Sequence, residues 1–270
     1  MFSKLNHVAI VSEDYAGEAQ FYQAVFGMKT SKNALLGTAI TVGDGYVGLN
    51  INPRYAGRPA HLDHFGIEVE DVERVFDRMQ KKYPSAKWLK RPGNRPFAGI
   101  SANDTDGNIF DISQRDMANR TNMYVDNAKV EEGNCYITHF AIRTLNPDAV
   151  AEFYQDVFEL TPRNKDSGDP NHYLTDGRVT MVIRPWQLKD YAGTSIYPAG
   201  MEHIGFTVKN YAEFRAHAES VLAKNPLLAP LAAGSGTEAE TRIKLTRSDC
   251  AVFRNYWTDP DGIVISVGET

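Results

Sequence analysis

The sequence predicts an α+β fold of two tandem domains, and an internal repeat with a constant offset is the main reason for this prediction. Three matched blocks recur 132 residues apart, and such regular spacing indicates two copies of one folded unit. The length of 270 residues also fits two domains of about 100 to 150 residues each. The matched blocks are residues 5–10 (LNHVAI) and 137–142 (ITHFAI), 21–26 (FYQAVF) and 153–158 (FYQDVF), and 43–45 (GDG) and 175–177 (TDG).

Each copy divides again into two modules. Residues 64–69 (HFGIEV) open the second module of the first copy, and residues 203–208 (HIGFTV) open its counterpart. Each copy then closes on a turn followed by a strand, at residues 104–111 (DTDGNIFD) and 259–266 (DPDGIVIS). The offset grows from 132 to 139 (203 − 64) and then to 155 (259 − 104), so the second copy contains two insertions. The larger insertion lies around Leu227–Thr241 and is rich in Ala, Gly and Pro, which predicts a surface loop or flap.

The same order of elements is predicted in every module: one strand, one helix, then about three strands. Leu5–Val11 is apolar and rich in strand-forming residues. Asp14 and Asn146 are candidate helix N-caps, and Pro147 suits a first helical position. Apolar residues then recur at helical spacing, at positions 21, 22, 25 and 26 and at positions 72, 75, 76 and 79. A polar stretch divides the chain into a first domain (1–116), a linker (117–134) and a second domain (135–270).

Composition excludes several classes of protein. The net charge of −5 and the lack of a basic tract argue against nucleic acid as a partner. No stretch approaches the roughly 18 apolar residues that a membrane helix needs, and the N-terminus lacks the features of a signal peptide. The two cysteines, Cys135 and Cys250, are too few for a disulfide framework. We therefore expect a cytoplasmic protein that acts on a small molecule; the sequence leaves a homo-oligomer open.

The four modules resemble the vicinal oxygen chelate superfamily, which includes glyoxalases, bleomycin-resistance proteins and extradiol ring-cleaving dioxygenases. The resemblance covers nearly the whole chain and rests on the repeated first-strand histidines and the repeated Asp-x-Asp-Gly turns. It implies that two βαβββ modules pair into a U-shaped open barrel with a divalent metal in its concave face. Modules that pair in swapped order, which would bring His7 towards His203 instead of His64, remain open at this stage.

The family's metal ligands lie on the first strand of a module and on the last strand, four residues after the turn glycine. Carried over to this chain, the resemblance implies His7, His64 and Asp111 in the first domain. In the second domain it implies a weaker site at His139 and His203, because Ser266 stands where the acidic ligand would be. The family's further glutamate has no clear match in either copy. The other histidines, at positions 61, 172 and 217, read as ordinary surface residues.

Two histidines and one carboxylate form a facial triad that leaves coordination positions open. This set suits Fe(II) activating O₂ beside a chelating substrate, with Mn(II), Zn(II) and Ni(II) as alternatives. Strand alternation places Asp111 on one face with Ile109 and Ser113, and it places Phe110 and Ile112 on the opposite, core-packing face.

Two further residues are candidates for the reaction. Tyr256, three residues before Asp259-Pro260, resembles the tyrosine of the extradiol signature, which assists the substrate hydroxyl. Arg95 is a candidate for binding an anionic group near the cleft of the first domain, although a solvated loop arginine is the competing reading.

The favoured hypothesis is an Fe(II)-dependent extradiol-type dioxygenase that cleaves a small aromatic diol. One alternative is a glyoxalase-like lyase or isomerase with another divalent metal. The other is a metal-free protein that sequesters a ligand, which would have no need of Asp111 beside two histidines.

Overall fold

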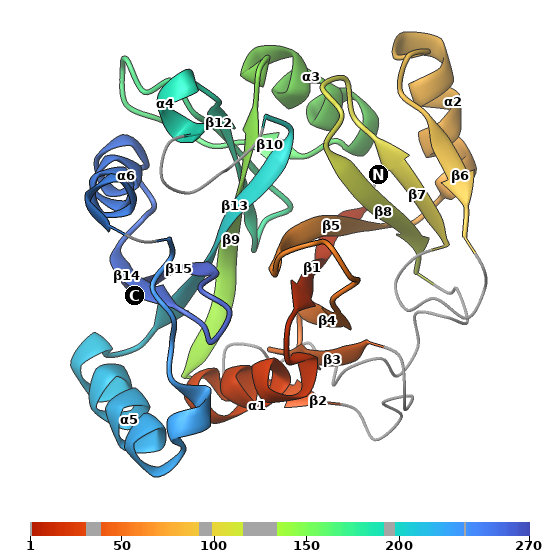
Figure 1. Cartoon of the computed structure of the whole chain (residues 1–270). Helices are drawn as coiled ribbons and strands as arrows, with labels where there is room; N and C mark the ends of the chain where they lie inside the picture. The colour runs from red at the N-terminus through yellow and green to blue at the C-terminus, as the bar shows by residue number, and fades with distance from the viewer. Residues whose placement is uncertain (1, 31–38, 92–98, 116–133, 192–197, 235) are drawn as a thin grey trace.

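A computed structural model describes the chain except for residues 1, 31–38, 92–98, 116–133, 192–197 and 235. Two mixed sheets, one from each half of the chain, carry the architecture, and helices pack around them (Figure 1). This is the α+β, two-domain fold that the repeat predicts. The predicted linker falls largely outside the described residues. None of the described helices combines the length and apolar character that crossing a bilayer requires.

The first domain contains an eight-stranded sheet in the order β2-β3-β4-β1-β5-β8-β7-β6. Its two central strands, β1 and β5, are the first strands of the two modules and run antiparallel. The first and second modules therefore share one sheet, and the swapped pairing is not observed. The sheet stays open between its edge strands β2 and β6, as a U-shaped half-barrel does. Its elements are β1 (Ser3–Ser12), α1 (Tyr15–Phe26), β2 (Lys29–Thr30), β3 (Ile40–Gly43), β4 (Gly48–Pro53), β5 (His61–Val69), α2 (Val72–Lys82), β6 (Trp88–Lys90), β7 (Ile100–Asn103) and β8 (Ile109–Gln114).

The second domain repeats this plan in a seven-stranded sheet, in the order β10-β11-β12-β9-β13-β15-β14. Strands β9 and β13 are the counterparts of β1 and β5 and also run antiparallel. Its elements are β9 (Cys135–Thr144), α3 (Pro147–Phe158), β10 (Thr161–Pro162), β11 (His172–Thr175), β12 (Thr180–Pro185), α4 (Leu188–Tyr191), β13 (Gly200–Val208), α5 (Tyr211–Lys224), the 3₁₀ helix η3 (Pro226–Leu228), α6 (Gly236–Asp249), β14 (Asn255–Thr258) and β15 (Val264–Glu269).

The repeated sequence blocks meet at the interface between the two domains. The Tyr22 hydroxyl on α1 donates to Asp259 Oδ2 of the second domain at 2.9 Å. Its counterpart Tyr154, on α3, donates to Asp104 Oδ2 of the first domain at 3.1 Å. Buried aromatic rings fill the space between these contacts, including Phe26 stacked on Phe206 with 4.2 Å between centroids. The reciprocal contacts hold both sheets around one continuous apolar core, because a buried hydroxyl and a buried carboxylate each need a hydrogen-bonding partner.

The large insertion is not the surface loop that its composition predicts. Only its first part is irregular, after the short η3, and the chain then forms α6 from Gly236 to Asp249. The turn after α6 brings Cys250 and Phe253 against Ala141 and Val182 of the second sheet. The insertion therefore adds a helix, and the segment after it packs onto the second sheet.

Candidate metal centre

Two β-bulges set the orientation of the histidines on β1 and β5. The register between these strands shifts between Leu5 and His7 and again between Ala9 and Ile10. The residues skipped by the ladder are Asn6 on β1 and Asp63 on β5. A bulge bends its strand and re-aims the adjacent side chains. As a result, Asn6 and Asp63 each lie beside the imidazole of the histidine that follows them.

His7, His64 and Asp111 converge on the same face of the first sheet. Asp111 Oδ2 lies 3.1 Å from His64 Nε2 and 3.9 Å from His7 Nε2. The two imidazole rings are perpendicular, with their centroids 5.6 Å apart. One potential ligand atom from each of the three residues lies within 4.8 Å of the other two. Among the described residues, this is the one group of three or more His, Cys, Asp or Glu side chains with that spacing.

The opposite nitrogen of each histidine is engaged by the bulge residue. His7 Nδ1 lies 2.9 Å from Asn6 Oδ1, and the Asn6 amide in turn donates to Ser113 Oγ. His64 Nδ1 lies 2.6 Å from Asp63 Oδ2. An acceptor at Nδ1 holds the proton there and leaves the Nε2 lone pair for a metal. These two hydrogen-bonding partners could not be predicted from the sequence, because strand alternation alone would turn Asn6 and Asp63 to the other face.

Charges around His64 favour a cation at this position. Burial lowers the pKa of His64, but hydrogen bonds and charge from Asp111 and Asp63 outweigh it and raise this pKa to about 9. Burial raises the pKa of Asp111, but the hydrogen bond and charge of His64 outweigh it and lower that pKa. Ser101 donates to Asp111 Oδ1, which leaves Oδ2 facing the two histidines. Both shifts have the same cause, the close approach of carboxylates to the His64 imidazole, which stabilises positive charge at this position.

Glycine at position 66 makes room for the His7 ring. A Cβ atom there would lie 2.0 Å from His7 Cε1 and 2.2 Å from His7 Nδ1. The second domain repeats this constraint, since a Cβ at Gly205 would lie 1.9 Å from His139 Cε1. The glycine two residues after His64 and after His203 is therefore a sequence signal for a histidine ring packed against the neighbouring strand.

The donor set and its spacing fit a divalent metal ion. Ligand atoms about 2.1 Å from one ion lie roughly 3 to 3.5 Å apart at right-angled or tetrahedral positions. The distance from Asp111 Oδ2 to His64 Nε2, 3.1 Å, lies within that range, and the distance to His7 Nε2, 3.9 Å, exceeds it. Small movements of the His7 ring would complete the coordination. Two neutral imidazoles and one carboxylate would leave the remaining positions for substrate and a further ligand.

A pocket with a volume of about 380 Å³ opens over this centre. His64, Asp111 and Ser101 lie in its wall, together with residues of β6 and of the segment before β5. The volume suits a ligand of one or two rings, within the usual range of small-molecule sites. The first domain thus offers both the metal ligands and an adjacent space for a substrate.

The second domain keeps the histidine pair and lacks the acidic ligand. The rings of His139 and His203 lie 5.3 Å apart at 82°, nearly as in the first domain. Ser266 occupies the position equivalent to Asp111, and its hydroxyl accepts a hydrogen bond from the Arg254 backbone N–H. Burial, followed by the charges of His203, Arg254 and Arg163, lowers the pKa of His139 well below its usual value. His139 and His203 stay a prediction for a weaker metal site.

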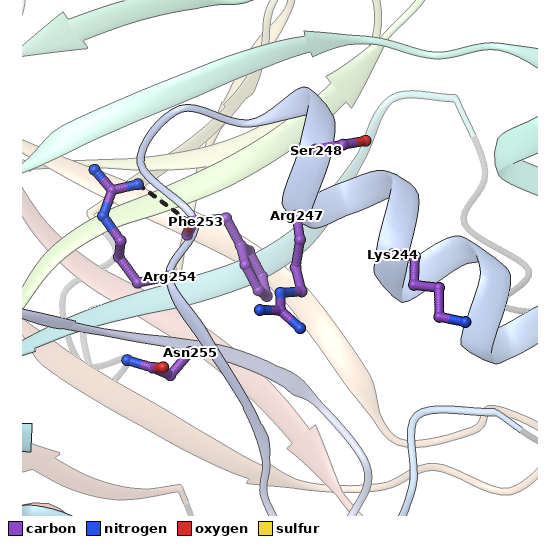
Figure 2. A pocket seen from close by; sticks show the side chains of 6 residues that line it. All are labelled: Lys244, Arg247, Ser248, Phe253, Arg254 and Asn255. Carbon is purple, nitrogen blue, oxygen red and sulfur yellow. Dashed lines mark hydrogen bonds between the residues drawn. The ribbon is translucent and has the colours of Figure 1, made fainter. Parts of the chain in front are cut away.

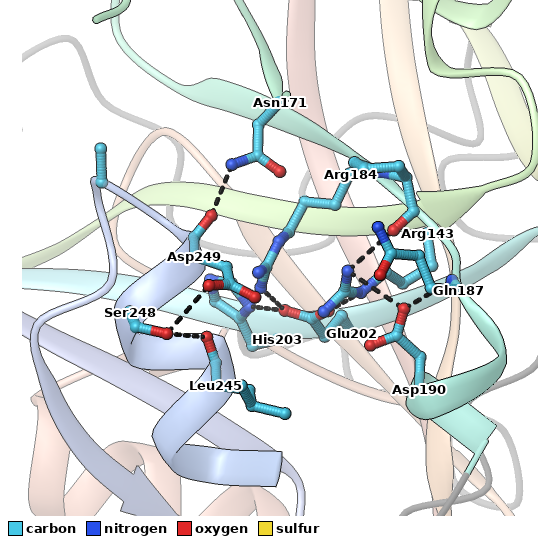
Figure 3. Close-up of polar contacts among 12 residues, drawn as sticks. Arg143, Asn171, Arg184, Gln187, Asp190, Glu202, His203, Leu245, Ser248 and Asp249 are labelled. Atoms are coloured by element: carbon cyan, nitrogen blue, oxygen red, sulfur yellow. Dashed lines mark hydrogen bonds and ion pairs between the residues drawn. The ribbon is translucent and has the colours of Figure 1, made fainter. Parts of the chain in front are cut away.

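Arginine side chains neutralise the acidic residue next to His203 (Figure 3). Glu202 accepts a hydrogen bond from Arg184 Nη1 through Oε1 and another from Arg143 Nε through Oε2. The same Oε1 lies 2.9 Å from His203 Nδ1. Arg184 is 1% exposed and Arg143 is 5% exposed, so this network is part of the protein interior. Arg143 Nη1 also lies 3.4 Å from Asp190 Oδ2, so two guanidinium groups and two carboxylates balance in charge beside His203.

The segment after α6 packs beside the histidine pair of the second sheet. The Phe253 ring packs edge-on against His203 with 5.0 Å between centroids. The cavity on this segment is lined by basic and neutral residues, including Lys244, Arg247 and Arg254 (Figure 2). Among the described residues, its lining includes no carboxylate and no histidine. The pocket lined by residues of the His-His-Asp group, His64 and Asp111, belongs to the first domain.

Tyr256, one of the two other predicted site residues, lies apart from the metal centre of the first domain. Tyr256 is on β14, opposite Ser266 in the second sheet, and its hydroxyl accepts a hydrogen bond from the Ala233 backbone N–H. It is not among the residues that line the pocket over His64 and Asp111. A metal in the first domain would therefore act without Tyr256. Arg95 lies outside the described residues.

Removing the bulge-residue acceptors should weaken metal binding while leaving every direct ligand in place. We expect Asn6→Ala and Asp63→Asn each to lower metal affinity roughly 10- to 100-fold, the usual cost of losing an outer partner of a metal-bound histidine. Competition with a chromophoric chelator measures this. Thr138→Ala is the matched control, because Thr138 contacts His139 Nδ1 in the second domain. An equal loss in Thr138→Ala, or none in Asp63→Asn, would contradict this role.

Comparisons with known proteins agree with this architecture. The family model for the Glyoxalase/Bleomycin resistance protein/Dioxygenase superfamily matches residues 4–112 and 136–267. No curated protein matches the chain significantly. One similar solved structure is a xylose isomerase-like TIM barrel/4-hydroxyphenylpyruvate dioxygenase fusion protein, with 13% identity and a TM-score of 0.59. The match covers 82% of this chain and 38% of the fusion protein.

Other solved structures match along most of both chains. The 2,2',3-trihydroxybiphenyl 1,2-dioxygenase of Sphingomonas wittichii strain RW1 is 13% identical, with a TM-score of 0.64 and coverage of 100% of this chain and 91% of that one. The 2,3-dioxygenase LapB of Pseudomonas sp. KL28 is 13% identical, with a TM-score of 0.65 and coverage of 99% and 92%. The Mn(II)-bound glyoxalase of Novosphingobium aromaticivorans is 15% identical, with a TM-score of 0.62 and coverage of 98% and 81%. These identities show a shared fold, and the family model extends over both halves of the sequence. The chain belongs to the Glyoxalase/Bleomycin resistance protein/Dioxygenase superfamily.

Proposed function

We propose that the protein is an Fe(II)-dependent, extradiol-type dioxygenase that cleaves a small aromatic diol in its first domain. The convergence of His7 Nε2, His64 Nε2 and the Asp111 carboxylate on one point beside an open pocket carries this proposal. A two-histidine, one-carboxylate set with open positions is characteristic of non-haem Fe(II) oxygenases. The dioxygenases among the structural neighbours support the same choice.

His7, His64 and Asp111 would hold the metal. When bound, Fe(II) supplies a redox-active centre at which a chelating diol and O₂ can exchange electrons. The protein's own part is positioning. Asn6 and Asp63 fix the imidazole orientations, and Ser101 holds one oxygen of Asp111 so that the other faces the histidines. The surrounding strands keep this geometry rigid, since all three ligands belong to the central part of one sheet.

Oxygen consumption with a panel of catechols tests the proposed reaction. The protein is loaded anaerobically with Fe(II), and O₂ uptake is followed together with the visible absorbance of a ring-opened product. We expect turnover with Fe(II) and none with Zn(II), because Zn(II) has no redox chemistry. Conversion of a hemithioacetal with Zn(II), Ni(II) or Mn(II), without O₂ uptake on any catechol, would favour a lyase or isomerase instead. Tight binding of a ligand by metal-free protein would favour sequestration.

A further inference from the structure

The far wall of the metal pocket is formed by the edge strand β6 and its flanking residues. Leu89 pairs with Ser101 on β7, and Ser101 pairs with Asp111 on β8. Residues directly opposite one another in neighbouring strands point to the same face. Leu89 therefore lies in one row with Ser101 and Asp111, on the face that carries the metal ligands.

Lys87 and Arg91 flank Leu89 on the same face. Side chains two residues apart along a strand share a face. The ladder continues past both ends of β6, through Asn103 N–H to Lys87 C=O at 3.0 Å and Arg91 N–H to Gly99 C=O at 3.0 Å. Lys87, Leu89 and Arg91 all line the pocket over the metal centre. Lys90 alternates to the opposite face and does not line the pocket, whereas Trp88 on that opposite face does.

The pocket has an excess of positive charge that its own acids do not neutralise. Arg58, in the segment between β4 and β5, adds a third cation to the lining. The two acids in the lining, Asp63 and Asp111, are both engaged with histidines. In the described part of the chain, no ion pair involves Arg58, Lys87 or Arg91. The Lys87 ammonium donates one hydrogen bond, to the Pro84 carbonyl at 2.9 Å, which leaves its charge unneutralised. A bound divalent metal would add further positive charge, so the pocket favours a ligand with more negative charge than a diol alone.

Apolar side chains accompany the cations. Leu89 is 54% exposed and Ile109 is 57% exposed, and both line the pocket. Adjacent exposed apolar residues in a pocket wall are typical of a ligand contact. Leu89 lies between Lys87 and Arg91 in sequence, so the apolar and cationic contacts come from one short segment.

We propose that the substrate carries a carboxylate on its aromatic ring or on a short side chain, and that Lys87 and Arg91, with Arg58, recognise it. This rests on the proposed function for the placement of the diol at the metal. Leu89 and Ile109 contact the ring, and the guanidinium and ammonium groups bind the carboxylate at the pocket wall. Arginine suits this task because its planar fork matches a carboxylate. Lys87 and Arg91 are therefore specificity-determining residues.

The test compares two nearly isosteric probes, 3,4-dihydroxybenzoate and 4-methylcatechol. Wild-type, Lys87→Met and Arg91→Met proteins are loaded with Fe(II), and the ratio of kcat/KM for the acid to that for the neutral catechol is measured. Comparing ratios cancels the electronic difference between the probes. We expect each variant to lower the ratio on the order of tenfold, as the loss of a charge-assisted hydrogen bond does. The kcat/KM for 4-methylcatechol should change little, because this probe has no carboxylate.

Lys90→Met is the matched control, because it removes the same charge from the same strand on the other face. An equal fall in the ratio for Lys90→Met would overturn the assignment in favour of a general electrostatic effect. Calorimetric binding of both probes to Zn(II)-loaded protein gives a second readout that needs no turnover. If the wild-type protein binds the acid preferentially and Lys87→Met and Arg91→Met abolish this preference, carboxylate recognition by these residues is supported even if no catechol is cleaved. Equal binding of the acid and the neutral catechol by the wild-type protein would overturn the proposed carboxylate recognition even if ring cleavage occurs.

Discussion

Asp111→Asn should abolish metal-dependent activity and remove nearly all bound metal. The substitution keeps the volume of the side chain and removes the only anionic ligand of the centre, so two neutral imidazoles alone would have to hold a divalent ion. We expect a loss of metal affinity larger than the roughly 10- to 100-fold that an outer partner contributes. Asp111→Ala should give the same result. Residual metal in Asp111→Asn protein that is absent from Asp111→Ala protein would show that the Asn amide oxygen still binds the metal. Elemental analysis after desalting, together with O₂ uptake, measures both effects.

Ser266→Ala is the control for this substitution, since Ser266 occupies the equivalent position in the second domain. Its hydroxyl bonds only the Arg254 backbone in the described structure, so we expect unchanged metal content and activity. Circular dichroism and thermal unfolding establish that the Asp111 variants remain folded. Stoichiometric metal in folded Asp111→Ala protein would contradict the assignment of Asp111 as a ligand.

Gly66→Ala should displace the His7 imidazole and so disrupt the centre without changing any ligand. The new Cβ would lie 2.0 Å from His7 Cε1, far inside contact distance, and the ring is buried with little room to move. Such overpacking costs about 1 to 3 kcal/mol of stability and shifts neighbouring side chains. We expect a decrease in the free energy of unfolding of that order and a loss of metal affinity greater than about tenfold. Chemical denaturation and chelator competition measure the two quantities.

Gly205→Ala separates these two effects. It creates the same steric conflict with His139, where a Cβ would lie 1.9 Å from Cε1. We expect a similar loss of stability with the metal retained, because the ligands in the first domain are untouched. If Gly205→Ala released the metal and Gly66→Ala did not, the functional centre would belong to the second domain.

The repeat predicted the two-domain fold, and the resemblance to the family implied the three residues that converge in the first domain. Residues at equivalent positions in matched modules have equivalent positions in the sheets, so His7 and His64 could be placed on paired strands. Strand alternation also placed Phe110 and Ile112 correctly in the core. The turn motifs were recognised as repeats, but their interface role was not, because contacts such as Tyr22–Asp259 join segments 237 residues apart.

Features that depend on pairing between distant strands could not be predicted. The bulges at Asn6 and Asp63 exist only in the register between β1 and β5, and a sequence shows no register directly. The wall of Lys87, Leu89 and Arg91 depends in the same way on β6 and β7. The Ala, Gly and Pro content of the insertion favoured a loop, whereas Gly236–Asp249 forms a helix, an ordinary case of a weak local preference being overridden.

Metal content in His7→Ala and His139→Ala protein tests the central claim most directly. Both substitutions remove a buried first-strand histidine, so their general structural costs are similar. Only His7 faces a carboxylate ligand as well as a second histidine. We predict about one divalent metal per chain in wild-type and His139→Ala protein and almost none in His7→Ala protein. Full metal content in His7→Ala protein, with loss in His139→Ala protein, would contradict a metal centre in the first domain.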